Sequence, residues 1–244
     1  MKKTQLYFWK PLMESYKKEL SMVTDYYNRT KPVFGDSEKE ATEYANHIYE
    51  AFPANEDTDP AMVAEFAFEE GLRQYEVLEV MKRNHLLMTI SMLCQIWEQQ
   101  LIKFTMSELN NFLEFRNNAL SFNDAKKVFE THGLKVEERV SWNNIREMRM
   151  LVNTIKHGEG GSARRLRAVR PDFFEHEHDD LKGTDTLELA GSVLLDSYSL
   201  NVKEDDFAKY VTSTEAFWEG MPERAFSDTD SIINAFKKKQ SDSG

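Results

Sequence analysis

LLMTISMLCQIWEQQLIKF, residues 86–104, is the stretch that decides the fold. Its apolar residues recur every three or four positions, which places them along one face of a helix of about five turns. They are Leu86, Ile90, Leu93, Trp97, Leu101 and Phe104. Residues 86–97 are the longest apolar-biased run, and this run is well short of the roughly 20 residues needed to span a bilayer. The pattern therefore predicts a core helix.

Further helices are expected on both sides of this stretch. Apolar spacing, capping residues and Gly or Pro stops predict helices over residues 4–27, 37–52, 121–132, 142–157, 163–169, 204–219 and 231–239, and a long helical region begins at Asp59-Pro60. Ser37 with Glu40 reads as a capping box, and Ser162 reads as the N-cap of residues 163–169. Residues 187–202 have room for a short β-hairpin. We expect a mainly α protein, a helical bundle with extra N-terminal helices.

Domain organisation follows from the same breaks. The chain has 244 residues, enough for one large or two small domains, with only 10 Gly and 6 Pro. We expect residues 1–58 to form an N-terminal helical segment packed on a helical domain of residues 59–240, the whole making one compact unit. The residues contain no secretory signal and no candidate membrane span.

The cysteine content and the net charge limit the function classes. A single cysteine, Cys94, excludes an internal disulfide framework and a structural zinc site built on several thiolates, and it suits the reducing cytoplasm. The net charge of −11 disfavours a uniformly basic sheath for nucleic acid. Residues 146–170 are the exception, because they hold seven basic and two acidic side chains.

One face of the helix expected over residues 142–157 is polar. Arg146, Arg149, Asn153 and His157 follow one another at spacings of three and four, so they share a face opposite the apolar residues. With no carboxylate on that face, this strip suits an anionic ligand such as a phosphodiester. The alternative is an ordinary solvated helix face.

A glycine-rich turn comes directly after this helix. The turn leads into a second helix whose free backbone N–H groups can hold phosphate. The predicted phosphate-binding residues are Arg146, Lys156, Gly160, Gly161, Ser162, Arg164 and Arg165. The turn has neither the Lys-Ser/Thr pair of a P-loop nor a preceding strand, which argues against ATPase and NAD-binding functions. The alternative is a flexible turn after a helix end, with the nearby arginines neutralised by the chain's own acids.

Residues 151–158, LVNTIKHG, resemble the signature of the HEPN family. Asn153, His157 and Gly158 match that signature, whereas Val152 stands where the family has an arginine. Residues 86–104, with Glu98, are similar to an earlier helix of the family's bundle. The resemblance covers approximately residues 80–175.

The resemblance implies a cytoplasmic RNA-binding protein or metal-independent endoribonuclease of a bacterial defence or toxin-antitoxin system. Its site would lie at a homodimer interface, need no cofactor and use His157, Asn153 and Arg149. Histidine suits the proton transfer because imidazole gains and loses protons near neutral pH. The alternative, favoured by Val152, is an inactive helical module that binds a protein partner or a nucleotide.

Two other features carry weaker signals. The run Glu175-His176-Glu177-His178-Asp179-Asp180 has residue types that ligate divalent metals, but an exposed acidic loop is the better explanation because no third, distant ligand is identifiable, and we assign no metal. Cys94 lies among the core-facing positions of residues 86–104, so we expect a buried, inert thiol.

Overall fold

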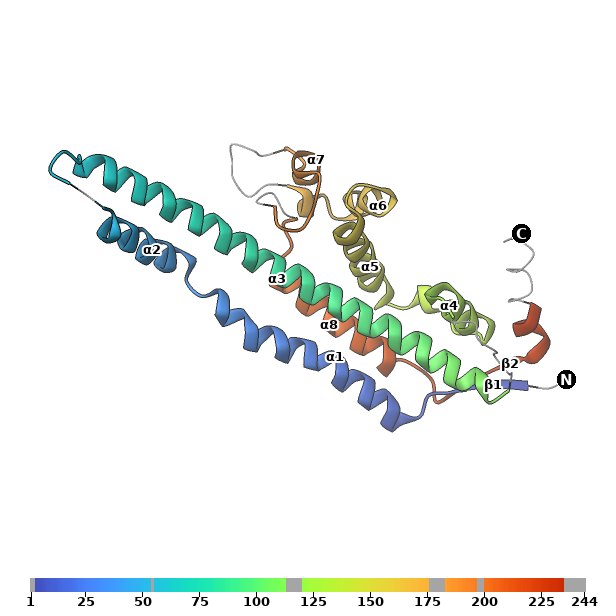
Figure 1. Ribbon diagram of the computed structural model, residues 1–244. Coiled ribbons are helices and arrows are strands. Elements are labelled where there is room, and N and C mark those ends of the chain that lie inside the picture. Colours follow the sequence, from blue (N-terminus) through green and yellow to red (C-terminus); the bar gives the residue numbers. More distant parts are fainter. Residues whose placement is uncertain (1–2, 54, 113–119, 176–182, 197–199, 235–244) are drawn as a thin grey trace. The chain divides into compact units, whose positions relative to one another are not determined.

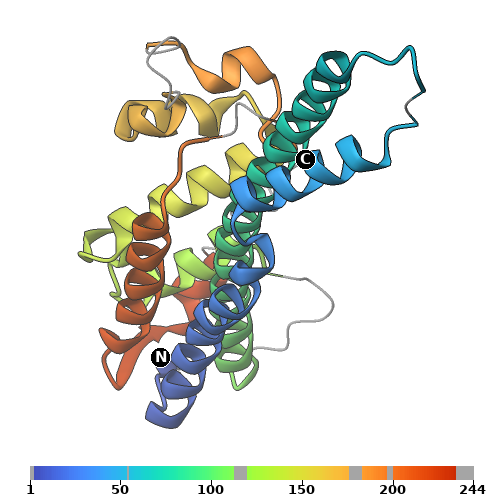
Figure 2. The same ribbon diagram turned by 90° about the vertical axis from the view of Figure 1, so that its left-hand side faces the viewer.

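The computed structural model describes residues 3–53, 55–112, 120–175, 183–196 and 200–234. The mainly α fold is confirmed, because helices dominate these residues and one small sheet accompanies them (Figures 1 and 2). The chain divides into two compact units. The first unit comprises residues 1–24, 90–149 and 205–244, and the second comprises residues 25–89 and 150–204. The boundary expected between residues 58 and 59 lies inside the second unit.

Three helices begin in one unit and continue without a break into the other. They are α1 (Lys10–Thr30), α3 (Pro60–Asn110) and α5 (Trp142–His157). The first unit also contains β1 (Lys3–Tyr7), α4 (Phe122–Thr131), the 3-10 helix η2 (Val136–Glu138), nearly all of α8 (Glu204–Glu219), and β2 (Arg224–Asp228). The expected helices over residues 121–132, 142–157 and 204–219 are thus confirmed.

The sheet pairs the two ends of the chain. β1 and β2 are antiparallel, with Leu6 opposite Ala225 and Lys3 opposite Asp228. The helix expected from residue 4 therefore begins only at Lys10, and residues 3–7 are a strand instead. Burial alternates along this strand, with Thr4 and Leu6 buried and their neighbours less so, as a half-buried strand requires. The strand's partner lies more than 200 residues away in sequence, so local spacing does not reveal the pairing.

Aromatic side chains form the core of the first unit. Phe8 stacks on Phe104 with ring centroids 4.7 Å apart, and Trp97 meets Phe217 edge to face at 5.2 Å. The buried Gln100 joins this core, because its Oε1 accepts a 2.9 Å hydrogen bond from the Trp218 indole N–H. All four tryptophans of the chain belong to this unit: Trp9, Trp97, Trp142 and Trp218.

The second unit contains parts of the three long helices and several short elements. These elements are the 3-10 helix η1 (Lys31–Phe34), α2 (Ser37–Ala51), α6 (Gly161–Val169), the 3-10 helix η3 (Pro171–Phe174) and α7 (Thr186–Ala190). Residues 187–202, where we expected a hairpin, contain most of α7, and the observed sheet is the β1–β2 pair. The core of this unit includes Leu151, Val152, Ile155, Leu166, Phe173, Phe174, Leu187 and Val193.

α2 and the first half of α3 form a helical hairpin (Figure 1). The helices meet closely at Gly71, where an added Cβ would lie 2.8 Å from the Cβ of Ala45. Ser37 is not the N-cap that we expected. Asp36 caps α2 by accepting the Lys39 N–H at 3.2 Å, and the Ser37 hydroxyl instead donates a 2.8 Å hydrogen bond to Glu79 of α3. A carboxylate caps a helix as well as a hydroxyl does.

Within the described part of the chain, no helix is both long enough and apolar enough to cross a membrane. Even α3, with 51 residues, carries charged side chains along most of its length. Helical structure is also present at residues 229–234, which include residues 231–234, the described part of the helix expected over residues 231–239.

Candidate functional site

Helix α5 has one buried face and one polar face, as its spacing predicts. Ile145, Met148, Leu151 and Ile155 are buried, whereas Arg146, Lys156 and His157 are exposed and Arg149 and Asn153 are half-buried. Arg146 and Arg149 belong to the first unit, and Asn153, Lys156 and His157 belong to the second. The predicted site residues therefore separate into two groups, and only the second group lies in the same unit as the glycine turn.

Arg149 is not an unpaired cation, contrary to the expectation of an unneutralised strip. Its Nε donates a 2.5 Å hydrogen bond to Glu98, and its guanidinium lies 3.5 Å from the centroid of the Phe122 ring. The carboxylate compensates the positive charge, and the ring covers one face of the guanidinium. These interactions give Arg149 a structural role in the first unit. Glu98 lies 51 residues earlier, so the helix pattern of α5 does not reveal it.

Val152 is 3% exposed and belongs to the core. It lies five positions before His157, which places the two side chains about 140° apart around the helix axis. His157, by contrast, is exposed at the last position of α5. The position where the family signature has an arginine is thus a core position at the flank of the polar face, about 60° around the helix axis from Arg149.

The turn between α5 and α6 is shaped by Gly158. This residue adopts a left-handed conformation, with φ of 63°, which glycine tolerates at a helix end, and its N–H donates to the Thr154 carbonyl at 2.8 Å. Gly160 is the N-cap of α6 and provides no side-chain cap. Since α6 begins at Gly161, the expected N-cap Ser162 lies inside the first turn, where its hydroxyl accepts a 3.4 Å hydrogen bond from Arg165. The first amides of α6 therefore lack a side-chain acceptor from the N-cap.

The arginines after the turn fall into two classes. Arg167 donates to Glu159 at 2.6 and 2.9 Å and to Asp185 at 2.5 and 3.1 Å, and Arg170 pairs with Asp172 at 2.7 Å. The positive charges of these two arginines are therefore neutralised by the chain's own carboxylates, as the alternative explanation of the basic segment expects. Arg164 and Arg165 are instead exposed. No ion pair to either of them forms among the described residues, and the same is true of Lys156 and His157.

Arg167 holds the turn in place, a role that the sequence did not reveal. It connects Glu159, within the turn, to Asp185, whose Oδ1 also accepts the N–H groups of Leu187 and Glu188 at the start of α7. Hydrogen bonds from Arg167 keep the pKa of the Glu159 carboxyl below its ordinary value. Burial raises the pKa of Asp185, but hydrogen bonds from Arg167 and the two backbone amides outweigh burial and leave that pKa lowered.

The His-rich acidic run and Cys94 are the other two candidate features of the sequence. In the His-rich acidic run, the structure describes only Glu175, which is exposed and whose backbone forms an isolated antiparallel β-bridge with Asp185. Residues 176–180 lie outside the described residues. Among the residues that are described, no group of three or more His, Cys, Asp or Glu side chains could hold a metal ion. Cys94 is 2% exposed, which confirms the expected burial of its thiol.

Comparison of the chain with protein-family models, with curated proteins and with solved structures finds no match.

Proposed function

We propose that the protein binds RNA, through phosphate groups held at the turn between α5 and α6. One observation carries the proposal. Four exposed cationic or ionisable side chains, Lys156, His157, Arg164 and Arg165, lie within five residues in sequence of the α6 N-terminus, whose N-cap residue is a glycine, and none of them has an ion-pair partner among the described residues. Uncapped amides and arginines both favour phosphate oxygens.

The turn is also fixed in position, which supports a binding role. Arg167 connects Glu159 to Asp185, so binding an anion need not first order the loop. Loss of conformational freedom is a major cost of association, and a preformed site avoids part of it. The Gly160 N–H donates to the Glu159 carboxylate, so Gly161 and Ser162 would present backbone N–H groups, while Arg164 and Arg165 supply positive charge.

Binding is favoured over catalysis. Arg149 is paired with Glu98, and position 152 holds a buried valine in place of an arginine, so neither position supplies a free guanidinium beside Asn153 and His157. Stabilising the charge of a transition state typically requires such a preorganised donor. A metal-independent, HEPN-like endoribonuclease is our second candidate, and the exposure of His157 at the end of α5 is the observation that favours it.

The wider context is proposed from the family resemblance and the composition. We place the protein in the cytoplasm, where Cys94 stays reduced, and in a bacterial defence or toxin-antitoxin system, acting as a homodimer without a cofactor. Light scattering at micromolar concentration tests the oligomeric state. A mass near 28.5 kDa, that of one chain, would contradict the dimer.

The binding experiment measures the affinity for labelled single-stranded RNA at several salt concentrations. The double change Arg164→Ala and Arg165→Ala should weaken binding and flatten the log–log salt dependence by roughly 0.7 for each phosphate that is no longer neutralised. The matched control is Arg73→Ala, which removes an exposed cation from the α2–α3 hairpin and should leave affinity unchanged. A loss of affinity in Arg73→Ala that is half or more of the loss in the double variant would mean that net charge explains the effect, because the control removes one charge and the double variant removes two; that result would contradict the site.

The cleavage experiment separates the two candidate functions. Purified protein is incubated with total RNA in the presence of a chelator, and His157→Ala is tested beside it. We expect binding without cleavage. Cleavage that survives chelation and disappears in His157→Ala would select the endoribonuclease instead.

A further inference from the structure

The net charge of the chain is concentrated in the α2–α3 hairpin. Residues 36–81 contain thirteen acidic side chains and only two basic ones, Lys39 and Arg73, which gives −11. The whole chain also has a net charge of −11, so the remaining residues sum to zero. Lys39 pairs with Glu43 at 3.8 Å, and Arg73 pairs with Glu70, so both cations are already neutralised within the hairpin. The hairpin is therefore a strongly anionic surface.

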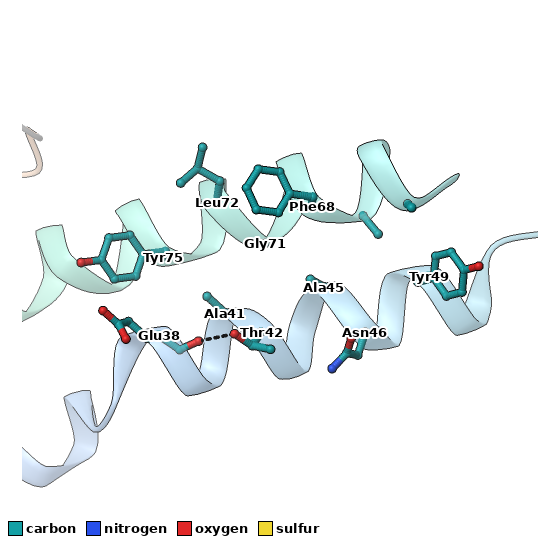
Figure 3. A pocket seen from close by; sticks show the side chains of 12 residues that line it. Glu38, Ala41, Thr42, Ala45, Asn46, Tyr49, Phe68, Gly71, Leu72 and Tyr75 are labelled. Carbon is teal, nitrogen blue, oxygen red and sulfur yellow. Dashed lines mark hydrogen bonds between the residues drawn. The ribbon is translucent and has the colours of Figure 1, made fainter. Parts of the chain in front are cut away.

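A groove of about 610 Å³ lies between the two helices of this hairpin. Figure 3 shows its α2 wall, with Glu38, Thr42, Asn46 and Tyr49, and its α3 wall, with Phe68, Leu72 and Tyr75. Small residues form the contact between the helices: Ala41, Ala45, Ala67 and Gly71. Because these side chains are short, they cover little of the larger side chains that flank them.

The uncovered side chains of the groove are large and apolar. Phe68 is 69% exposed, Leu72 is 50% exposed and Tyr49 is 47% exposed. A single exposed apolar residue is ordinary on a protein surface, but several that line one groove are typical of a binding site. Burying them against another molecule would recover the free energy that their exposure costs.

Carboxylates extend both walls of the groove. Glu38 lines the α2 wall, and Glu50 lies one helical turn beyond Asn46 on the same helix face. On α3, Glu76 follows Leu72 at the same spacing. All three glutamates are exposed, and no ion pair to them forms within the described residues. An apolar groove with acidic ends complements a ligand with the reverse arrangement.

We propose that this groove binds a cationic amphipathic helix of another protein, with apolar side chains against Phe68 and Leu72 and with lysines or arginines near the glutamates. Helix-in-groove binding uses this combination of apolar anchors and flanking charge. A second copy of the chain is disfavoured as the occupant, since two hairpins of charge −11 would repel each other. This site is independent of the proposed RNA site, which uses α5 and α6.

The test uses two synthetic helical peptides of about 18 residues with the same leucine and tryptophan face, long enough for about five helical turns. One peptide carries lysine at the remaining positions and the other carries glutamate. Fluorescence anisotropy with the full-length protein should show binding of the lysine peptide alone. The double change Phe68→Ala and Leu72→Ala should weaken this binding at least about tenfold. The matched control, Met88→Ala, removes a side chain that is 52% exposed on α3 outside the groove and should have no effect.

A second pair of variants tests the contribution of charge. Glu38→Gln with Glu76→Gln should weaken the binding of the lysine peptide several-fold and reduce the dependence of its affinity on salt. Lys237, Lys238 and Lys239 follow Phe236 in this chain's own sequence, so their joint replacement by glutamine is a further control that should leave peptide affinity unchanged.

Several results would overturn the proposal. Equal binding of the glutamate peptide would mean that charge plays no part, and undiminished binding in the Phe68→Ala, Leu72→Ala variant would mean that the groove plays none. A dimer that dissociates in this variant would make a second copy the occupant. Tighter peptide binding after the replacement of Lys237–Lys239 would assign the groove to the chain's own terminal residues.

Discussion

Two carboxylates with a lowered pKa depend on one arginine, Arg167, and this makes stability dependent on pH. Asp185 and Glu159 bind protons less readily in the folded chain than in the unfolded chain. Their contribution to stability is therefore complete above the unfolded pKa values, about 4, and is lost as pH falls through the lower folded values. The melting temperature of the wild type should decrease in this acidic window.

Replacing Arg167 tests this link. Arg167→Met should lower the melting temperature at pH 7 by about 3–6 °C, because two charge-assisted pairs are removed and the side chain is 23% exposed. The difference from wild type should shrink as pH falls below about 4, the ordinary pKa of such carboxyls, and through the lower pKa values of the folded chain. The control is Arg165→Met, because Arg165 is exposed and forms no ion pair among the described residues. A difference that stays constant across this pH range would contradict the argument.

The candidate site shows what residue patterns can and cannot predict. The polar face of α5 and the glycine turn follow from spacing within about 25 residues, so they are visible in sequence. The partners that decide the roles of the arginines are distant. Glu98 lies 51 residues from Arg149, and Asp185 lies 18 residues from Arg167 in a separate loop. Pairings of this kind depend on tertiary packing, and no local periodicity encodes them.

At the scale of elements, the close approach of α2 and α3 depends on Gly71. Gly71→Val should lower the free energy of unfolding by about 1–3 kcal/mol, because even a Cβ would lie 2.8 Å from Ala45 and 3.1 Å from the Ala41 carbonyl oxygen. Chemical denaturation followed by circular dichroism measures this change. Glu76→Val, at an exposed site on the same helix, also introduces a β-branched residue but no clash. Valine forms helix slightly better than glycine does, so helix propensity alone would leave Gly71→Val as stable as the wild type, and that result would contradict the close approach.

Elements were predictable where caps and periodicity coincide. The helix α8 begins and ends where the spacing predicts, and α4 begins after Ser121, which forms a reciprocal capping box with Asp124. The strand β1 was missed because its register depends on β2, at the other end of the chain. Ser162 was misassigned because the helix can begin at Gly161 with only a glycine as its N-cap.

At the scale of the whole molecule, the position of the tryptophans allows a direct measurement of cooperativity. Tryptophan fluorescence reports on the first unit alone, whereas circular dichroism at the helical band reports on both units. Since α1, α3 and α5 run through both units, melting one unit would require breaking three continuous helices. We expect the two denaturation curves to coincide, as for a single cooperative transition. A fluorescence midpoint that is clearly separated from the circular dichroism midpoint would indicate units that unfold independently.

The burial of Val152 limits which mutations this sequence can accept during evolution. An arginine acquired at this position would bring an unpaired charge into the interior, at a cost of several kcal/mol against a total stability of about 5–15 kcal/mol. A nuclease arginine therefore cannot arise here by one mutation that leaves the helix in its present orientation. The helix would first have to rotate about its axis, and rotation would expose Leu151 and Ile155, which the core now covers. The packing of α5 thus disfavours the single substitution that would give this helix the arginine of the nuclease signature.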